Sequence, residues 1–270
     1  MIDVICEMMR FPFAVRALSA GSLIAVCAAL IGVVVVLKRI SMIGDGLSHV
    51  GFAALAIASV CSMAPLLIAI PVVVVASFLL LRLAEGKVLS GDSATAVISV
   101  SALSVGVIIL SVTTGMTTDV NNYMFGSILS MSKADAIVGT AASLVMTVLF
   151  VIFYNRMFAV TFDEDFAKAS GVKVESLRMI LSVMTAVVVV VGLRIVGAML
   201  ISGLLIFPAL SAMRIAKSYF GVTLAAAVIG LACFLCGITA SFILAIPSGA
   251  AVILMNLLVF LVCCGFGKRN

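Results

Sequence analysis

The chain has 270 residues, of which 65% are apolar and only 10% are charged, and its mean hydropathy is +1.42. A soluble domain carries charge on about a quarter of its residues, so this composition excludes the soluble globular class. The formal net charge of +5 does not indicate nucleic-acid binding, because the sequence has no basic patch with interleaved aromatic residues.

The apolar residues form long runs, such as 23–37 and 179–193, that are hydrophobic on all sides of a helix. The alternating strands of a membrane β-barrel are absent from the sequence. We therefore predict an all-α membrane protein, a polytopic bundle of eight or nine transmembrane helices that forms a single domain over residues 1–270. The predicted spans are 17–37, 42–62, 65–82, 92–113, 134–154, 177–193, 196–213, 218–237 and 247–266. Alternatively, residues 177–213 form one long helix and a re-entrant piece, which gives eight spans.

The positive charges favour one orientation of this bundle. With the N-terminus outside, the inner loops hold most of the 16 lysines and arginines, namely Lys38, Arg39, Arg82, Lys87, Arg156, Lys168, Lys173, Arg178, Arg214, Lys217, Lys268 and Arg269. The outer segments hold only Arg10, Arg16, Lys133 and Arg194. By the positive-inside rule, the C-terminus of a multi-pass protein of the cytoplasmic membrane then lies in the cytoplasm.

The second span carries an acidic residue and the only histidine, Asp45 and His49. Their i, i+4 spacing places both side chains on one helical face. Counted from Lys38 at 1.5 Å per residue, they lie about 10 Å and about 16 Å along the helix, near the middle of the membrane. An ionisable pair at this depth indicates function, and a carboxylate with an imidazole suits zinc or manganese. We predict a transient metal site in a translocation pathway.

Glycines flank this pair at Gly44, Gly46 and Gly51, and they favour close helix packing and a locally unwound backbone. Two structural alternatives remain for the polar pair. Asp45 and His49 could hydrogen-bond to each other or to caps and lock the helices together. Asp45 could also begin a helix after a break at Gly44.

The outer loop 114–133 carries Asp119, Asn121, Asn122 and Tyr123. It is either the rim that receives an extracellular donor protein or a loop that re-enters the membrane interface, with Tyr123 as an anchor.

The longest polar stretch, 162–177, lies in an inner loop over about residues 157–177. It predicts a short amphipathic helix that ends at Gly171 in a left-handed cap. The acidic residues 163–165 favour the N-terminus of this helix through the helix dipole. Phe162 and Phe166, spaced i, i+4, would anchor this helix in a cytoplasmic partner. The alternative is a solvated loop helix.

The seven cysteines lie mostly in or beside apolar runs, where a thiol behaves as a small hydrophobe. Cys233 and Cys236 have the spacing of half a zinc site, but no second pair or histidine accompanies them in the sequence. Packing is the favoured interpretation, and a metal or redox role is the alternative.

Motifs of enzymes are absent from the sequence. Neither Gly-Lys pair, at 86–87 and 267–268, is followed by Ser or Thr as a Walker A motif requires. The sequence also has no H-E-x-x-H and no G-x-S-x-G, so a proteolytic or lipid-processing enzyme is disfavoured. We therefore expect a transport subunit and not an enzyme, with any ATP hydrolysis on a separate polypeptide.

Five motifs in order resemble those of the transmembrane permeases of ATP-binding-cassette importers for zinc, manganese and iron. Residues 44–49, G-D-G-L-S-H, resemble the family's G-D-x-x-[SA]-H signature, and 121–129, N-N-Y-M-F-G-S-I-L, are similar to its Y-L-F-G-x-I-L stretch. Residues 166–171 resemble its F-A-x-x-x-G coupling loop. Residues 196–209, which contain Pro208, are similar to its V-G-x-L-L…L-I-x-P-A segment. Residues 247–250, beginning at Pro247, resemble its P-[ST]-G-A turn.

This resemblance implies a homodimer with two cytoplasmic ATPase subunits and an extracellular metal-binding lipoprotein or periplasmic binding protein. It also implies that Phe166, Ala167 and Gly171 couple to the ATPase, and that no cofactor is permanently bound while a divalent metal is transported. The form of residues 44–50 is most similar to that of the zinc importers, so zinc is favoured over manganese and ferrous iron. An ion-gradient-driven secondary transporter of a small cation is the alternative. It should show an internal repeat and further membrane-embedded acids, which the sequence lacks.

Overall fold

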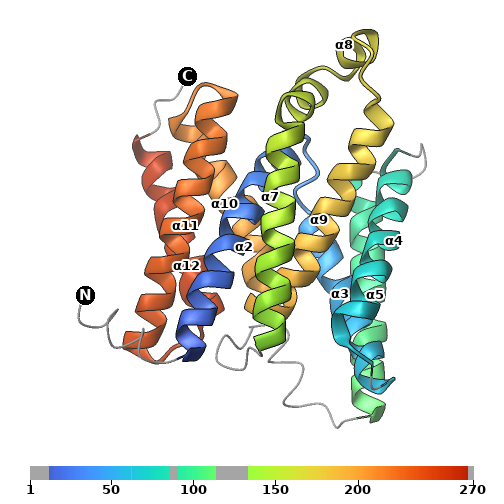
Figure 1. Ribbon diagram of the computed structural model, residues 1–270, viewed down its shortest axis with the longest axis vertical. Coiled ribbons are helices and arrows are strands. Elements are labelled where there is room, and N and C mark those ends of the chain that lie inside the picture. The colour runs from blue at the N-terminus through green and yellow to red at the C-terminus, as the bar shows by residue number, and fades with distance from the viewer. Residues whose placement is uncertain (1–11, 62, 86–90, 114–132, 267–270) are drawn as a thin grey trace.

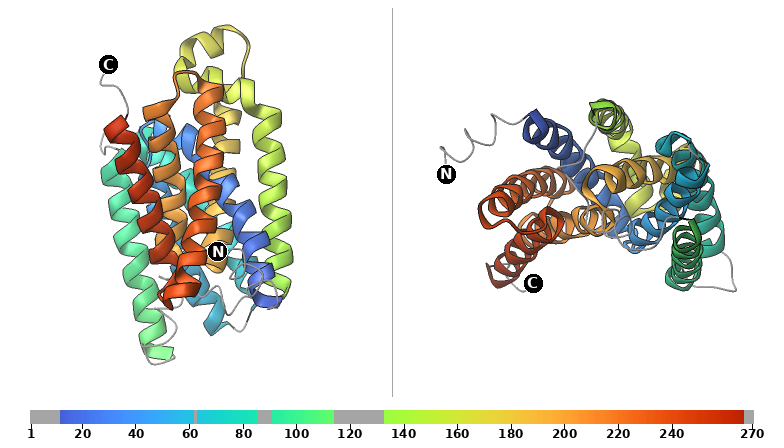
Figure 2. Two further views of the ribbon diagram at one scale, coloured as in Figure 1. Left: turned by 90° about the vertical axis from the view of Figure 1, so that its left-hand side faces the viewer. Right: turned by 90° about the horizontal axis from the view of Figure 1, so that it is seen from below.

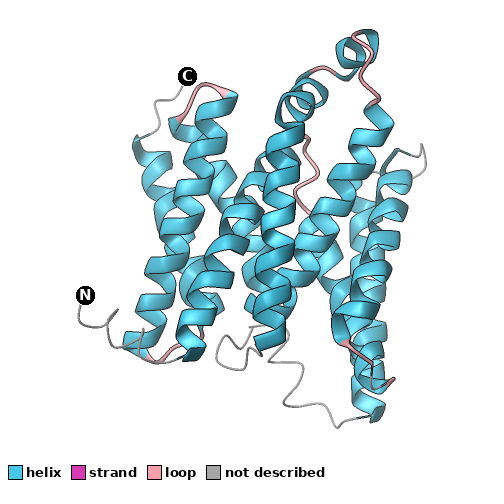
Figure 3. Ribbon diagram, viewed as in Figure 1, coloured by secondary structure: helices cyan, strands magenta, loops and turns pink. Residues whose placement is uncertain are grey.

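The computed structural model describes residues 12–61, 63–85, 91–113 and 133–266, and all regular secondary structure in these ranges is helical (Figures 1 and 3). The helices are α2 (Pro12–Leu37), α3 (Ile43–Val60), α4 (Pro65–Glu85), α5 (Gly91–Thr113), α7 (Lys133–Phe162), α8 (Glu164–Ala169), α9 (Val174–Val196), α10 (Ala198–Ile215), α11 (Tyr219–Leu244) and α12 (Ser248–Phe266).

In the described part of the chain, nine helices are long and apolar enough to cross a membrane, which confirms the nine-span prediction. The boundary between the predicted sixth and seventh spans lies at Gly197, which has a φ of 94° and separates α9 from α10. Each of these two helices meets the length and hydropathy of a span. They are therefore two spans, and the eight-span alternative is wrong.

Two helices run well beyond their predicted ends. α7 has 30 residues instead of the predicted 134–154 and contains Arg156, which was expected in a loop. α11 has 26 residues instead of the predicted 218–237. At 1.5 Å per residue α7 is about 45 Å long, whereas the hydrocarbon core is about 30 Å thick. Hydropathy detects only the part of a helix that fits the lipid, so the ends that extend beyond it were missed.

The bundle has a central group and an outer group of helices. In an apolar 18-residue stretch of α2, α3 and α9, 72%, 72% and 78% of the residues are buried, against 22–28% in the corresponding stretches of α4, α5, α7, α11 and α12. Figure 2 shows α11 and α12 at one end of the elongated bundle and α4 and α5 at the other. α9 packs against α2, α3, α4, α7 and α10, which explains why its valine-rich sequence is hydrophobic on every side.

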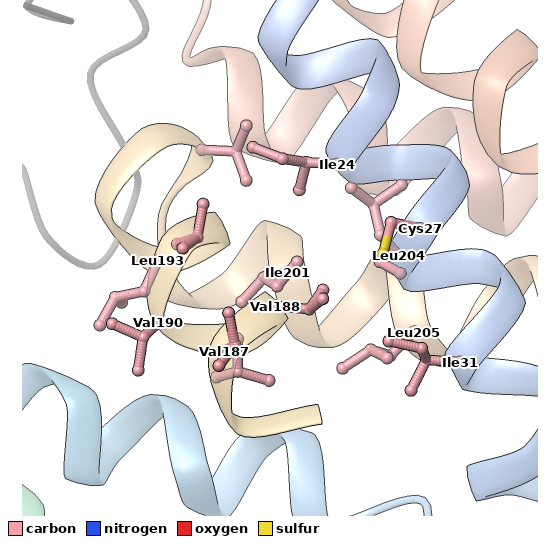
Figure 4. Close-up of a cluster of buried hydrophobic side chains, with 14 of the residues drawn as sticks. Ile24, Cys27, Ile31, Val187, Val188, Val190, Leu193, Ile201, Leu204 and Leu205 are labelled. Carbon is pink, nitrogen blue, oxygen red and sulfur yellow. The ribbon is translucent and has the colours of Figure 1, made fainter. Parts of the chain in front are cut away.

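The core lies where α2, α9 and α10 meet (Figure 4). Ile24 and Ile31 of α2 pack with Val188 of α9 and Leu204 of α10 in one buried cluster. A methyl group added at Gly32 would lie 1.9 Å from the carbonyl oxygen of Leu205. The glycine therefore lets the backbones of α2 and α10 approach closely, as small residues do in membrane bundles.

Candidate functional site

The segment that precedes the Asp45–His49 pair is not helical. α2 ends with Arg39 in a left-handed conformation (φ 58°), and the Ile40 N–H donates to the Val35 carbonyl at 3.1 Å. α3 begins only at Ile43, so residues 38–42 form a turn that Figures 1 and 3 show bending back between α7 and α9.

Asp45 and His49 are consequently placed differently from the prediction. A continuous helix from Lys38 was the basis of the predicted depths, and that basis is wrong because the helix starts five residues later, at Ile43. Asp45 is in the first turn of α3, and His49 lies one turn further along. α3 itself begins below the upper ends of α7 and α9 in Figure 1, because the turn carries the chain back into the bundle.

The two side chains lie on one helical face, as their spacing predicts. The distance from His49 Nε2 to Asp45 Oδ2 is 3.7 Å, which is longer than a direct hydrogen bond. The side chains are 20% and 44% exposed, so both donor groups are accessible to an ion or water. Asp45 does not cap the helix, because Met42 is the N-cap residue and makes no side-chain cap hydrogen bond. A carboxylate here is nevertheless favoured by the helix dipole.

The glycines of α3 allow three other helices to approach it. A methyl group added at Gly44 would lie 2.6 Å from Leu205 of α10. One added at Gly46 would lie 2.6 Å from Thr95 of α5, and one added at Gly51 would lie 2.8 Å from Leu193 of α9. The expectation of close packing is thus confirmed. The expectation of unwinding at these glycines is wrong, since α3 is a regular helix from Ile43 to Val60 and the irregular backbone precedes it.

Among the residues that the structure describes, no group of three or more His, Cys, Asp or Glu side chains could hold a metal ion. The described part of one chain therefore offers an oxygen donor from Asp45 and a nitrogen donor from His49, with no third such side chain beside them. A carboxylate oxygen with an imidazole nitrogen is compatible with zinc, manganese and ferrous iron. Two donors of this kind can contact a cation but are too few to enclose it.

The predicted loop helix is present as α8 at one end of the bundle (Figure 1). Asp163 caps its N-terminus, because its side chain accepts a hydrogen bond from the Phe166 N–H at 2.9 Å. Gly171 follows the helix with a φ of 80°, which confirms the predicted left-handed end. Ala167 is fully buried in a cluster with Val160 of α7 and with residues of α9, and it fixes α8 to the bundle.

Phe162 and Phe166 do not form a pair on one helix as predicted. Phe162 is the last residue of α7, and its ring lies 5.0 Å from that of Phe158 and 6.0 Å from that of Tyr219. Phe166 lies on α8 and is exposed. The chain breaks its helix at the extended Asp163, so the i, i+4 relation does not hold. Only Phe166 remains an exposed aromatic on α8.

A charged cluster that the sequence did not reveal surrounds Glu164, the first residue of α8. Lys38 Nζ donates to its Oε1 at 2.7 Å, and the Arg178 guanidinium pairs with its Oε2. Burial alone would raise the pKa of Glu164, but the hydrogen bonds and charges of Lys38 and Arg178 together hold it below its ordinary value. The sequence signal was limited to an acidic residue at a helix start, because Lys38 is 126 residues away.

Beside this cluster is a cavity of about 380 Å³. Residues of the 38–42 turn, of α4, α7, α8 and α9, and the first residue of α3 line this cavity. They include Lys38, Ile43, Glu164 and Arg178. The cavity therefore lies between the charged cluster and the beginning of the helix that carries Asp45.

The two predicted structural prolines occupy different settings. Pro208 is buried inside α10, where its Cγ would lie 3.5 Å from a methyl group added at Gly230 of α11. Pro247 directly precedes α12, and its carbonyl accepts a hydrogen bond from the Ala251 N–H at 3.1 Å. They support helix packing and a helix start, respectively.

Cys233 is buried and Cys236 is exposed on the same helix, so the two thiols of the CxxC pattern have different surroundings. The predicted outer-loop contacts, Asp119, Asn121, Asn122 and Tyr123, lie outside the described residues.

Comparisons with known proteins agree with this architecture. Residues 10–267 match the model of the ABC 3 transport family. The chain is 27% identical over 252 residues to the manganese import system permease protein ScaB of Streptococcus gordonii, covering 93% of this chain and 90% of the relative. It is also 30% identical over 80 residues to the high-affinity zinc uptake system membrane protein ZnuB of Haemophilus influenzae. That match covers 30% of this chain and 30% of the relative. A solved structure, PsaBC from Streptococcus pneumoniae in complex with Fab, superposes with a TM-score of 0.88 at 25% identity, covering 97% of this chain and 95% of that chain.

Proposed function

The chain belongs to the ABC 3 transport family, and from this membership we propose that it is the membrane permease of an importer that carries a divalent transition-metal ion across the cytoplasmic membrane. In this proposal the permease does not hydrolyse ATP. The energy comes from separate cytoplasmic ATPase subunits, and no cofactor is permanently bound.

The Asp45–His49 pair carries the metal part of the proposal. It combines an oxygen and a nitrogen donor on one face of α3, 3.7 Å apart and open to an ion. Two donors are too few for the closed tetrahedral site of a structural zinc. Incomplete coordination suits transport, because an ion that is bound too well is not released.

The missing ligands motivate the proposed homodimer. A two-fold axis beside α3 would bring the same Asp45–His49 pair from a second copy toward the ion, since a two-fold interface presents identical patches. Water or a backbone carbonyl would complete the coordination. An extracellular metal-binding lipoprotein or periplasmic binding protein would deliver the ion at the opposite end of the bundle from α8.

α8 is the proposed docking element for the ATPase. Phe166 is exposed on it, while Ala167 on its inner side is buried against α7 and α9. On its outer side α8 presents Phe166 beside the exposed, charged side chains of Asp165 and Lys168. A helix that is fixed on one side and offers an aromatic ring among charges on the other suits a partner that must push on the bundle.

Zinc is the favoured cargo because the sequence of residues 44–50 is most similar to that of the zinc importers. Manganese and ferrous iron are the alternatives. The chain is similar to proteins named for manganese and for zinc transport. The donor set accepts all three ions, so the pair alone does not select among them. Uptake by proteoliposomes supplied with each ion in turn would identify the cargo.

The decisive test is metal uptake by the reconstituted transporter carrying Asp45→Ala or His49→Ala. Each variant should lose uptake while expression, dimerisation and basal ATPase activity persist. Glu175→Gln is the matched control, because it removes an exposed carboxylate from the first turn of α9 and leaves α3 unchanged. Uptake at the wild-type rate by either variant would reduce the pair to a structural role. Uptake without an ATPase, driven by an ion gradient, would support the secondary transporter instead.

A further inference from the structure

Glu164 holds together three parts of the chain that are far apart in sequence. Its carboxylate accepts from Lys38, which directly follows α2, through one oxygen, and it pairs with Arg178 in α9 through the other. Each oxygen thus binds one cation. We call these three residues the charge clamp.

The clamp is shielded, unlike the neighbouring ion pairs. The side chains of Lys38, Arg178 and Glu164 are 14%, 22% and 31% exposed, whereas Glu175, which also contacts Arg178, is 72% exposed. Exposed pairs contribute little because water and salt screen them. The same charges interact more strongly when they are partly removed from water.

Stability alone does not explain the clamp. α8 is already fixed to the bundle by the buried Ala167 and its apolar neighbours. Taking three charged groups partly out of water has a desolvation cost, so a buried ion pair is weak evidence for stabilisation. Such pairs are better suited to specifying one arrangement of the elements they join.

The arrangement that this clamp specifies leads directly to the metal pair. Lys38 begins the non-helical turn 38–42, and α3 starts immediately after it with Asp45 in its first turn. Within the turn, Arg39 has a left-handed conformation, which is unfavourable for a residue with a side chain. Strained residues of this kind often mark segments that switch.

The cavity of about 380 Å³ provides room for movement. Its lining includes the three clamp residues and also Ile40 and Ile43, at the junction of the turn with α3. A shift of the 38–42 turn toward the cavity would therefore enter open space, whereas Gly44, one residue after the junction, stays packed against Leu205 of α10.

We propose that Glu164 is the positioning residue that transmits displacement of α8 to the start of α3 and so moves Asp45 and His49. Lys38 carries the displacement into the 38–42 turn, and Arg178 gives the carboxylate its fixed reference on α9. This inference rests on the proposed function, because it assumes that α8 receives the ATPase and that α3 carries the metal ligands.

The first test measures metal transported per ATP hydrolysed, in proteoliposomes that contain the permease, its ATPase and its binding protein. Glu164→Gln keeps the shape of the side chain and removes its charge, so this ratio should fall about fivefold or more. Lys38→Gln should give the same loss, and Lys38→Arg should restore the ratio. Glu175→Gln, which contacts Arg178 but not Lys38, should keep the wild-type ratio.

The double variant Lys38→Gln/Glu164→Gln distinguishes a shared path from two independent effects. If the clamp is one unit, the double variant should lose no more than either single variant. Losses that multiply, or a wild-type ratio in Glu164→Gln, would overturn the proposal.

A second measurement does not depend on transport. In the purified permease, Glu164→Gln should raise amide hydrogen exchange in residues 38–46, and Glu175→Gln should not. A change confined to α8 would show that the clamp only anchors that helix, and would overturn the proposal. If the wild-type protein transported no metal, the proposed function would fail. The exchange measurement would still decide whether α8 and the start of α3 are linked.

Discussion

Gly171 offers the sharpest test of how α8 is held. Its φ is 80°, and no described atom lies within 4 Å of a methyl group added at this position. The helix ends here because the Gly171 N–H donates to the Lys168 carbonyl and the Val172 N–H to the Ala167 carbonyl, both at 3.0 Å. A substitution should therefore destabilise this helix end through the backbone conformation that the new residue must adopt, and not through the size of its side chain.

The magnitude follows from this geometry. An L-residue in the left-handed region costs about 1–2 kcal/mol relative to glycine, and asparagine costs less because its side chain hydrogen-bonds locally. α8 has only six residues and could not persist alone in water. A loss of about 1–2 kcal/mol lowers the ratio of docked to undocked helix roughly 5- to 30-fold.

Hydrogen exchange of the amides of residues 166–170 in the purified permease would measure this loss. Gly171→Ala and Gly171→Leu should reduce protection by the same factor, and Gly171→Asn should reduce it less. Gly265→Ala is the matched control, because that glycine also has open space around it but lies in α12 without a positive φ. It should not reduce protection in α8.

One result would refute this reasoning. If Gly171→Leu lost much more protection than Gly171→Ala, the size of the side chain would matter and the space beside Gly171 could not be open. In the full transporter, the Ala and Leu variants should likewise weaken stimulation of the ATPase equally.

Three further predictions concern packing, orientation and pH. Gly32→Ala should lower the free energy of unfolding by about 1–3 kcal/mol, because the added methyl group would lie 1.9 Å from the backbone oxygen of Leu205. An unchanged midpoint of thermal unfolding would contradict this prediction. In a cysteine-depleted protein, a thiol reagent that cannot cross membranes should label Ile246→Cys in intact cells and Lys217→Cys only after permeabilisation, and the reverse pattern would invert the predicted topology. Because the pKa of Glu164 lies below its ordinary 4.5, its contribution to stability should be fully present above that value and lost only as the pH falls through the lowered pKa. Exchange protection of α8 should accordingly be constant from about pH 8 to about pH 6, and a loss within that range would contradict the clamp.

Local patterns in the sequence were enough to predict much of this protein. Hydropathy predicted nine spans, and the i, i+4 spacing placed Asp45 and His49 on one face. The acidic run followed by Gly171 predicted a short helix with a left-handed end. Each of these features depends on residues that are neighbours along one helix, so their periodicity and composition are sufficient to predict them.

Features with no local signal were missed or misplaced. The predicted start of the second span, residue 42, is one residue from the observed start of α3 at Ile43. Arg39, however, has a left-handed conformation that is typical of glycine, so the sequence did not show that residues 38–42 are a turn and not part of a continuous helix from Lys38. α7 continues past the lipid-length segment to Phe162, which separates that residue from Phe166. Both errors arise because a helix ends where its neighbours stop supporting it, not where its hydropathy falls.

The charge clamp shows most clearly what only the tertiary structure decided. Lys38 and Glu164 are separated by 126 residues, yet their charged atoms are 2.7 Å apart. Neither residue is unusual in its own segment, since one follows a transmembrane helix and the other begins a short polar one. Their meeting depends on how α2, α7 and α9 pack against one another. That packing arises from buried contacts distributed over the whole bundle, which no single stretch of sequence encodes.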